Sequence, residues 1–302
     1  MSFRLTLLDG RRKGRTAMEA IQSDHPARRP EQAAPRRARD GRVHRATFLL
    51  LLHAIPAGAL VTGTSRADWI MCGLFYVIGG IGMGIGLHRY FSHRSFRTSR
   101  SVQFLLATLA ATAFGDAVDF AGKHRLHHRH ADAPGDVHGP HDGFWYCWFG
   151  NLIDEQYTED EIVSAAADVA AFPELMWLHR HRAIPGLTAA AVVWCAGGFS
   201  MFAIGFCLSR VLILNASSAV NFVCHRWGQR PYATADLSTN NITLAWLTFG
   251  EGWHNNHHYY PTAARAGFHW WQVDPLYWVL RVLAGAGLVW GLREGPRARA
   301  GA

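Results

Sequence analysis

Residues 69–93 read WIMCGLFYVIGGIGMGIGLHRYFSH, an apolar run that ends in a polar segment with two histidines. A helix needs about 20 mostly apolar residues to cross a bilayer, so Trp69 to Leu87 predicts a membrane span. Its second half carries five glycines, which allow close helix packing in lipid: Gly79, Gly80, Gly82, Gly84 and Gly86. His88 and His93 follow directly, so the fold is predicted to place histidines at a membrane face.

Three further blocks predict membrane spans. Residues 46–65 contain no Asp, Glu, Lys or Arg, and neither do residues 183–209. Apolar character resumes after Arg210, so the second block predicts a hairpin turning near Gly197 and Gly198. Because a lone charge facing lipid is costly, Arg210 is expected to face a protein or aqueous interior. The prediction is an all-α integral membrane fold with four spans in two hairpins, at about 46–65, 69–87, 183–198 and 199–223.

Composition and charge agree with a membrane domain. The chain of 302 residues is 49% hydrophobic and 17% charged, against about 25% charged in an average protein. Residues 1–46 hold 12 Lys or Arg and 5 Asp or Glu, so +7 of the net +8 lies there. The predicted domains are a weakly structured basic tail at 1–45, a membrane domain at 46–292 and a short tail at 293–302. The basic tail suits anionic lipid better than nucleic acid, and without a hydrophobic run followed by a small-residue cleavage site it is not expected to be a secretory signal.

The topology follows from the distribution of charge. Under the positive-inside rule, the basic tail, residues 88–182 and the C-terminal region share the cytoplasmic face. Residues 101–115 predict a buried or interfacial helix, and residues 276–292 predict an amphipathic surface helix. The five cysteines show no paired spacing and are expected to be free thiols.

Nine histidines fall into four groups near the ends of the predicted spans. Two groups have the spacing HxxHH, and helix positions i, i+3 and i+4 lie on one face, so each can direct three imidazoles to one point. His88 and His93 are five apart, about 140° around a helix, so they reach different metals or the helix ends between them. The groups are His88 with His93; His124, His127 and His128; His225 with Asn221; and His254, His257 and His258.

These groups predict a metal centre. Neutral imidazole is a ligand for Zn, Cu and Fe. Two closed zinc sites would use eight ligands, whereas nine histidines at a membrane face fit two metals with room for oxygen. The remaining histidines are interpreted as ordinary surface or interior residues, with His138 and His141 the first to reconsider: His25, His44, His53, His130, His138, His141, His179, His181 and His269.

The four groups resemble the HxxxxH, HxxHH, HxxHH and NxxxH elements of the membrane-bound fatty acyl desaturases of the stearoyl-CoA (Δ9) type. The resemblance covers about residues 46–292. It is densest in stretches that look most like bacterial members of the family: residues 221–225, 230–232, 238–241, 248–258 and 270–275.

The resemblance implies two irons held by the nine grouped histidines, with Asn221 reaching one iron through water and a cytoplasmic cap over four helices. It implies an O2-dependent reaction that places a cis double bond, at Δ9, in a saturated acyl chain on coenzyme A or another carrier or lipid. Breaking an unactivated C–H bond needs a strong oxidant, which reduced iron and O2 can supply, so no separate general base is required. The bacterial inner membrane is the expected location.

Electrons must come from a separate donor. The sequence contains no His-Pro-Gly-Gly element of a fused cytochrome b5 and no CxxC pair of a rubredoxin. A ferredoxin, rubredoxin or cytochrome b5 is therefore the expected partner. Such donors are usually acidic, and the basic residues expected to dock them are Arg125, Arg129, Arg180 and Arg182.

The chain departs from the family pattern in two places. Animal enzymes place an Arg-Asp pair, which helps to hold the CoA head group, where this chain has Gly122 and Lys123. Further along, the family's Ser-His pair is replaced by Cys147 and Trp148, and its next Trp by Asn151. These departures weaken the expectation of CoA as carrier.

Two other functions are compatible with parts of the pattern. A membrane hydroxylase, ketolase or acetylenase would use the same metals, and the Asn221–His225 element and the Trp270-Trp271 block favour desaturation. A non-catalytic metal-binding or transport protein would place its ligands near the bilayer midplane, whereas these histidines lie at the ends of spans.

Overall fold

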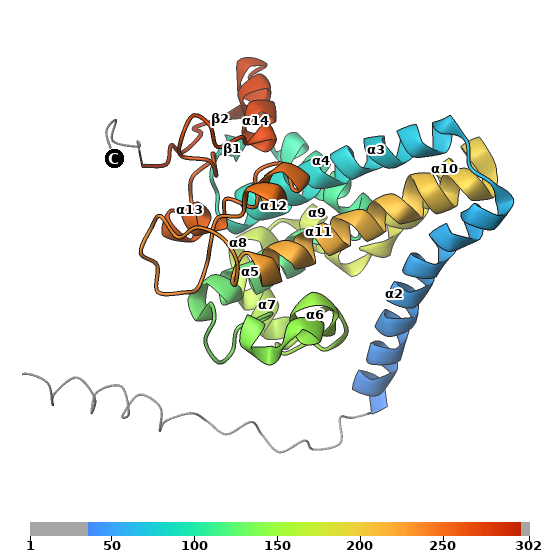
Figure 1. Cartoon of the computed structure of the whole chain (residues 1–302), viewed down its shortest axis with the longest axis horizontal. Helices are drawn as coiled ribbons and strands as arrows, with labels where there is room; N and C mark the ends of the chain where they lie inside the picture. Colours follow the sequence, from blue (N-terminus) through green and yellow to red (C-terminus); the bar gives the residue numbers. More distant parts are fainter. Residues whose placement is uncertain (1–35, 297–302) are drawn as a thin grey trace, which may run out of the picture. The chain divides into compact units, whose positions relative to one another are not determined.

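The computed structural model describes residues 36–296, and within them the fold is almost wholly helical (Figure 1). The chain forms two units, residues 1–44 and 45–302. Every element below belongs to the second unit, except that α2 begins in the first. Most of the predicted basic tail, and the end of the predicted C-terminal tail, lie outside the described residues.

Most elements follow one another with short connections, and the longer connecting segments are residues 224–241 and 260–274. Two short strands pair antiparallel, β1 (Arg97–Thr98) with β2 (Val289–Trp290). The helices are α2 (Arg36–Thr62), α3 (Arg66–Gly80), η1 (Ile81–Ser92), α4 (Arg100–Thr112), α5 (Ala117–His130), η2 (Pro140–Asp142), η3 (Tyr146–Gly150), α6 (Asn151–Ile153), α7 (Glu159–Ala165), α8 (Ala167–Ala170), α9 (Pro173–Arg180), α10 (Ala183–Ser200), η4 (Met201–Leu208), α11 (Ser209–Val223), α12 (Ile242–Leu247), α13 (His254–Tyr259) and α14 (Pro275–Gly285).

Two helical stretches of the described chain are long and apolar enough to cross a membrane, residues 66–92 and 183–223. The bent pair of α4 and α5 would make a third if it acts as one span, with an angle of 84° between its helices. The span predicted at 69–87 lies in the first stretch, and the span predicted at 46–65 falls mostly in α2. The total of four spans remains a prediction.

The second stretch folds back on itself at the predicted turn. Gly198 has φ 68° and ψ −157°, which breaks the helix. Trp194 and Phe202 are eight residues apart, yet their ring centroids are 5.3 Å apart. In a continuous helix eight residues would rise about 12 Å. The chain therefore reverses at Gly198, and α11 returns alongside α3 (Figure 1).

Arg210 faces the protein interior, as predicted. Its side chain is buried on α11 and donates hydrogen bonds to two backbone carbonyls, at Thr112 (2.8 Å) and Phe75 (2.6 Å). The rings of Phe75 and Phe206 lie beside the guanidinium. Arg210 thereby ties α11 to α3 and to the end of α4.

The glycines of the 69–93 stretch bring η1 close to its neighbours. A Cβ atom at Gly82 would lie 2.6 Å from the backbone nitrogen of Ala110 on α4, so only glycine fits. The main core cluster gathers around this contact and includes Ile85, Leu87 and Val118. The glycines therefore set the distance between η1, which ends beside His93, and the helices packed on it.

Helix α5 is held at its start by a buried acid. Asp116 accepts hydrogen bonds from the backbone N–H groups of Val118 and Asp119, which is a helix N-cap. The other Asp116 oxygen accepts a hydrogen bond from His179 Nδ1 on α9 at 2.7 Å, and His179 Nε2 contacts Glu159. The cap and the imidazole together fix α5, which carries three of the predicted metal ligands.

Replacing Gly82 with alanine should destabilise the protein. The added methyl group has no space against the backbone of α4, and overpacking of this kind costs about 1–3 kcal/mol. The melting temperature of the purified full chain in detergent should fall. Gly73→Ala is the matched control, since a Cβ atom there meets nothing within 4 Å. Equal melting temperatures for the two variants would contradict the close contact.

His179 should make stability depend on pH. The hydrogen bond to Asp116 raises the pKa of His179 to about 9, despite burial, from a usual 6.5. Its contribution is therefore complete below pH 6.5 and is lost as the pH rises through 9. His179→Gln should flatten this part of a plot of melting temperature against pH. His181→Gln, at an exposed position, is the control and should keep the wild-type profile.

Candidate metal centre

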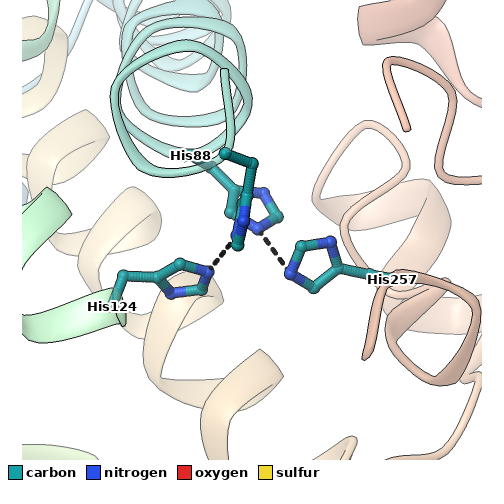
Figure 2. A group of neighbouring side chains, drawn as sticks. His88, His124 and His257 are labelled. Carbon is teal, nitrogen blue, oxygen red and sulfur yellow. Dashed lines mark hydrogen bonds between the residues drawn. The ribbon is translucent and has the colours of Figure 1, made fainter. Parts of the chain in front are cut away.

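The first histidine group consists of His88, His93, His124 and His257, whose ring nitrogens lie within 4.8 Å of one another. They come from η1, its C-cap, α5 and α13. Figure 2 shows the imidazoles of His88, His124 and His257 converging from these three elements. The Nε2 atoms of His88 and His257 are 3.0 Å apart, and those of His124 and His93 are 2.8 Å apart.

The second histidine group consists of His127, His225, His254 and His258, whose ring nitrogens also lie within 4.8 Å of one another. Its members come from α5, the end of α11 and α13. The Nε2 atom of His254 lies 3.0 Å from that of His225 and 3.1 Å from that of His258.

His128 adjoins the first group. Its Nε2 atom lies 3.0 Å from that of His124 and 2.9 Å from that of His257. Its ring centroid is also 4.5 Å from that of His258 in the second group. All nine histidines of the sequence prediction are therefore brought together in two adjoining groups.

Carboxylates contact the outer nitrogen of four of these imidazoles. His127 Nδ1 lies 2.7 Å from Asp136, His225 Nδ1 lies 2.8 Å from Asp132, and His258 Nδ1 lies 2.9 Å from Asp236. In the first group, His88 Nδ1 contacts Glu251. A carboxylate at Nδ1 keeps the proton there, so the Nε2 lone pair points into the group.

Glu251 belongs to a buried ion network. Arg89 donates hydrogen bonds to Glu251 Oε1 from Nε (3.2 Å) and Nη2 (2.9 Å), and to Asp274 Oδ1 at 3.0 Å. Burial alone would raise the pKa of Glu251, but His88 and Arg89 hold it at about 2. Similarly, burial favours a higher pKa for Asp136, yet the hydrogen bond from His127 keeps it below its usual range. Both carboxylates are therefore ionised and fix their imidazoles.

Hydrogen bonding cannot satisfy all the close contacts between Nε2 atoms. Burial, followed by the neighbouring histidines, lowers the pKa of His254, His257 and His258 well below 6.5, so these rings are neutral. A neutral ring offers at most one N–H at Nε2, yet the Nε2 of His254 meets two other Nε2 atoms. Because Asp132 and Asp236 keep the protons of His225 and His258 on Nδ1, at most one N–H group is available for the two contacts, and at least one contact has no hydrogen bond.

A metal ion removes this conflict. Two nitrogens bound at right angles to one metal, each about 2.1 Å from it, are about 3 Å apart, which matches the observed 2.8–3.1 Å. The Nε2 atom of His127 is buried and finds no hydrogen-bond partner among residues 36–296, so it too is a free donor to a metal. The residues present therefore fit one metal ion in each group.

His88 and His93 lie in the same group, whereas the sequence spacing suggested different metals or an intervening helix end. The helix does end between them, at Ser92, and η1 is wound as a π-helix. In a π-helix the repeat is i to i+5, which places residues five apart near the same face. The angle of about 140° between His88 and His93 was calculated for an α-helix. The amino-acid sequence alone does not indicate a π-helix.

The sequence reading missed several residues beside the groups. His138 was interpreted as an ordinary residue, but its ring is 4.3 Å from that of His127, and burial, followed by the neighbouring His127, lowers its pKa to about 3. The orienting carboxylates Asp132, Asp136, Asp236 and Glu251 were also missed as a set. For Asp132, Asp136 and Glu251 the sequence signal was proximity to an HxxHH group, whereas Asp236 lies 18 residues before His254 and had none. His141 forms an ion pair with Asp142 and belongs to neither group.

Asn221 lies one helical turn before His225 on α11 and is half-buried. Within residues 36–296 its side chain makes no hydrogen bond to the histidines, so its predicted contact through water stays a prediction.

The departures from the family pattern have physical reasons. A Cβ atom at Gly122 would lie 2.4 Å from the carbonyl oxygen of Ile162 on α7, and Lys123 pairs with Asp119 at 2.8 Å. No arginine fits at position 122 to bind a head group. Cys147 donates a hydrogen bond from Sγ to the carbonyl of His138 at 2.9 Å, so this substitution supports the segment beside His127.

Comparison with known proteins shows the family to which the chain belongs. The family model described as fatty acid desaturase matches residues 67–292. An acyl-CoA C20 Δ5-desaturase of Anemone leveillei is 35% identical, over 80% of this chain and 78% of its own length. An sn-1 stearoyl-lipid 9-desaturase of Anabaena variabilis is 32% identical, over 80% of this chain and 90% of its own. A chloroplastic palmitoyl-monogalactosyldiacylglycerol Δ7-desaturase of Arabidopsis thaliana is 33% identical, over 80% of this chain and 66% of its own length.

These matches confirm the resemblance seen in the histidine boxes, and the nine histidines all lie within the matched residues. The chain belongs to the fatty acid desaturase family of oxidoreductases.

Proposed function

We propose that this protein is an O2-dependent acyl desaturase that introduces a cis double bond, at Δ9, into a saturated acyl chain joined to coenzyme A or to a membrane lipid. The observation that carries the proposal is the convergence of nine imidazoles in two adjoining groups, with Nε2 atoms 2.8–3.1 Å apart. The similarity to a stearoyl-lipid 9-desaturase supports the position, although relatives named for Δ5 and Δ7 are equally similar.

The proposed ligands are those of the sequence prediction. His88, His93, His124, His128 and His257 would hold one iron, and His127, His225, His254 and His258 the other, with Asn221 acting through water. Such an iron pair supplies O2 activation strong enough to break an unactivated C–H bond.

The protein itself supplies orientation and exclusion of water. Asp132, Asp136, Asp236 and Glu251 hold four imidazoles with Nε2 directed inward. His127, His225 and His254 are each less than 5% exposed, so bulk water has little access to the second group. Fixed ligands and a dry site favour hydrogen removal over side reactions.

The proposed location is a bacterial inner membrane, with the histidine groups and both termini cytoplasmic. Support comes from the apolar stretches 66–92 and 183–223, both of which end beside ligands. The proposed electron donor is an acidic ferredoxin, rubredoxin or cytochrome b5. Of the four arginines expected to dock it, Arg125 is turned inward and hydrogen-bonds the carbonyls of Phe91 and Ala165, whereas Arg129, Arg180 and Arg182 are exposed.

Lipid analysis tests the reaction. The full chain is expressed in a host that lacks desaturases, and mass spectrometry with fragmentation locates any new double bond in the lipid and acyl-CoA fractions. A cis double bond at Δ9 is expected, and the fraction labelled first in a time course identifies the carrier. A hydroxylated, keto or acetylenic product would instead identify the related hydroxylase, ketolase or acetylenase chemistry.

The ligand assignment is tested by His257→Ala. This variant should abolish the product and lower the iron content, because His257 Nε2 meets both His88 and His128. His181→Ala is the matched control, since His181 is exposed and belongs to neither histidine group. Full product from His257→Ala would refute the assignment.

Charge reversal tests the docking surface. The double variant Arg180→Glu, Arg182→Glu should raise the KM for an acidic donor roughly tenfold at low salt, because electrostatic steering changes association by about 10- to 1000-fold. Turnover driven by a small chemical reductant should be unchanged. Arg66→Glu, at the far end of the span that leads to His88, is the control. An unchanged KM would show that Arg180 and Arg182 do not dock the electron donor.

A further inference from the structure

The two histidine groups differ in the charges that surround them. In the second group, three of the four imidazoles contact an aspartate through Nδ1, and in each pair the imidazole side chain is at most 1% exposed. The aspartates are Asp136, Asp132 and Asp236, with side chains 0%, 6% and 12% exposed. Three negative charges thus stand directly behind one set of ligands.

These aspartates are held by neutral donors. Asp136 accepts hydrogen bonds from the backbone N–H groups of Asp132 and His138. Asp132 accepts one from Leu237 N–H at 2.6 Å, and Asp236 accepts from Ser238 N–H and Thr234 Oγ1, both at 2.9 Å. Among the contacts found in residues 36–296, these carboxylates pair with no arginine or lysine. The exposed Arg230 donates a hydrogen bond to the backbone carbonyl of Asp236 at 2.6 Å, but among the described residues no guanidinium or ammonium group contacts the carboxylate oxygens themselves.

The first group has the opposite arrangement. Glu251 is the carboxylate that contacts it, through His88, and Arg89 donates two hydrogen bonds to the same Glu251 oxygen. The Arg89 side chain is only 3% exposed, so solvent screens this pairing little. Arg125, close to His93 and His124 on α5, is a second guanidinium on this side and binds Asp168. Because Arg89 also binds Asp274 at 3.0 Å, the cluster of Arg89, Glu251 and Asp274 carries one net negative charge, against three negative charges behind the second group.

A carboxylate hydrogen-bonded to a metal-binding imidazole changes the reduction potential of the bound metal ion. Carboxylates hydrogen-bonded to metal-binding imidazoles raise the basicity of the ligands. Interactions between charges are strong in a buried site because the local dielectric is low. An excess of negative charge stabilises the more positive oxidation state, and the potential of the ion in that site falls. The first site would have five imidazole ligands and the second four, but neutral imidazoles carry no charge, so the difference in carboxylate charge between the sites is unchanged.

We infer that the two iron sites of the proposed centre are unequal in redox potential: the ion held by His88, His93, His124, His128 and His257 is reduced first, and the ion held by His127, His225, His254 and His258 stays ferric longer. The inference rests on the proposed iron centre and adds the order in which it accepts electrons. Each step is the reduction of one ferric ion to ferrous by one electron from the donor.

The test is a potentiometric titration of the full chain in detergent, loaded with 57Fe and reduced stepwise with dithionite, with Mössbauer spectra at each potential. The wild-type protein should show two resolved one-electron steps. Asp236→Asn removes a charge behind the second group, so it should raise the lower potential and narrow the gap between the steps. Glu251→Gln removes a charge beside the first group, so it should raise the higher potential and widen the gap.

Two further variants complete the design. Asp132→Asn acts through His225 instead of His258 and should also narrow the gap, so the test does not depend on the folding of one variant. Glu174→Gln, whose carboxylate pairs with the exposed Arg100, is the control and should leave both steps unchanged.

The outcomes separate this inference from the proposed function. Two irons per chain with a single two-electron step, or a gap that moves in the same direction in Asp236→Asn and Glu251→Gln, would overturn the unequal sites even if a double bond is formed. Two resolved steps with the expected opposite shifts would support them even if the lipid product proves to be hydroxylated.

Discussion

The structure depends on one constraint, the close packing of nine buried or half-buried imidazoles with their Nε2 atoms directed at one another. The Nε2 atoms lie 2.8–3.1 Å apart, and carboxylates at Nδ1 hold four of the nine rings with the Nε2 lone pair directed inward. There are then too few N–H groups to satisfy every contact, and a cation between the rings would satisfy them. The helices that carry the histidines are held in place by interactions elsewhere: the glycine contact at Gly82, the cap at Asp116 and the buried Arg210. The metal-binding geometry is thus preorganised by the fold.

The two HxxHH helices tie the histidine groups to each other. Helix α5 contributes His124 to the first group and His127 to the second, and α13 contributes His257 to the first and His254 to the second. A rotation of either helix would therefore disturb both groups together. Because the spacing within a helix is fixed, the separation of the two groups is fixed as well. The two groups are therefore positioned together, as the proposed two-metal centre requires.

The sequence was informative wherever the signal was local. The convergence of each HxxHH group follows from spacing within one helix, the turn near Gly198 from a glycine pair in an apolar block long enough for two spans, and the interior position of Arg210 from the cost of charge in lipid. What could not be predicted depends on contacts between distant segments. Asp132 and His225 are 93 residues apart, and nothing in either segment indicates the pair. The π-helical winding of η1, which aligns His88 with His93, likewise arises from packing and has no residue signature. His138 was missed because its link to His127 passes through the loop after α5.

The positions of the carboxylates explain why this loop matters. Asp132 and Asp136 both lie in the loop after α5, and they orient one ligand from α5 and one from the end of α11. Asp136 also accepts the N–H of Asp132, so the two acids hold each other in place. Tyr157 and Cys147 hydrogen-bond to carbonyl groups of the same loop, at Gly135 and His138. The segment that departs most from the family pattern therefore supports the carboxylates of the second group, and its substitutions act on the metal site through hydrogen bonds to the loop backbone. Divergence here is compatible with the same nine histidines because the loop needs donors to its carbonyls, and a thiol can supply one, although it is a weaker donor than a hydroxyl.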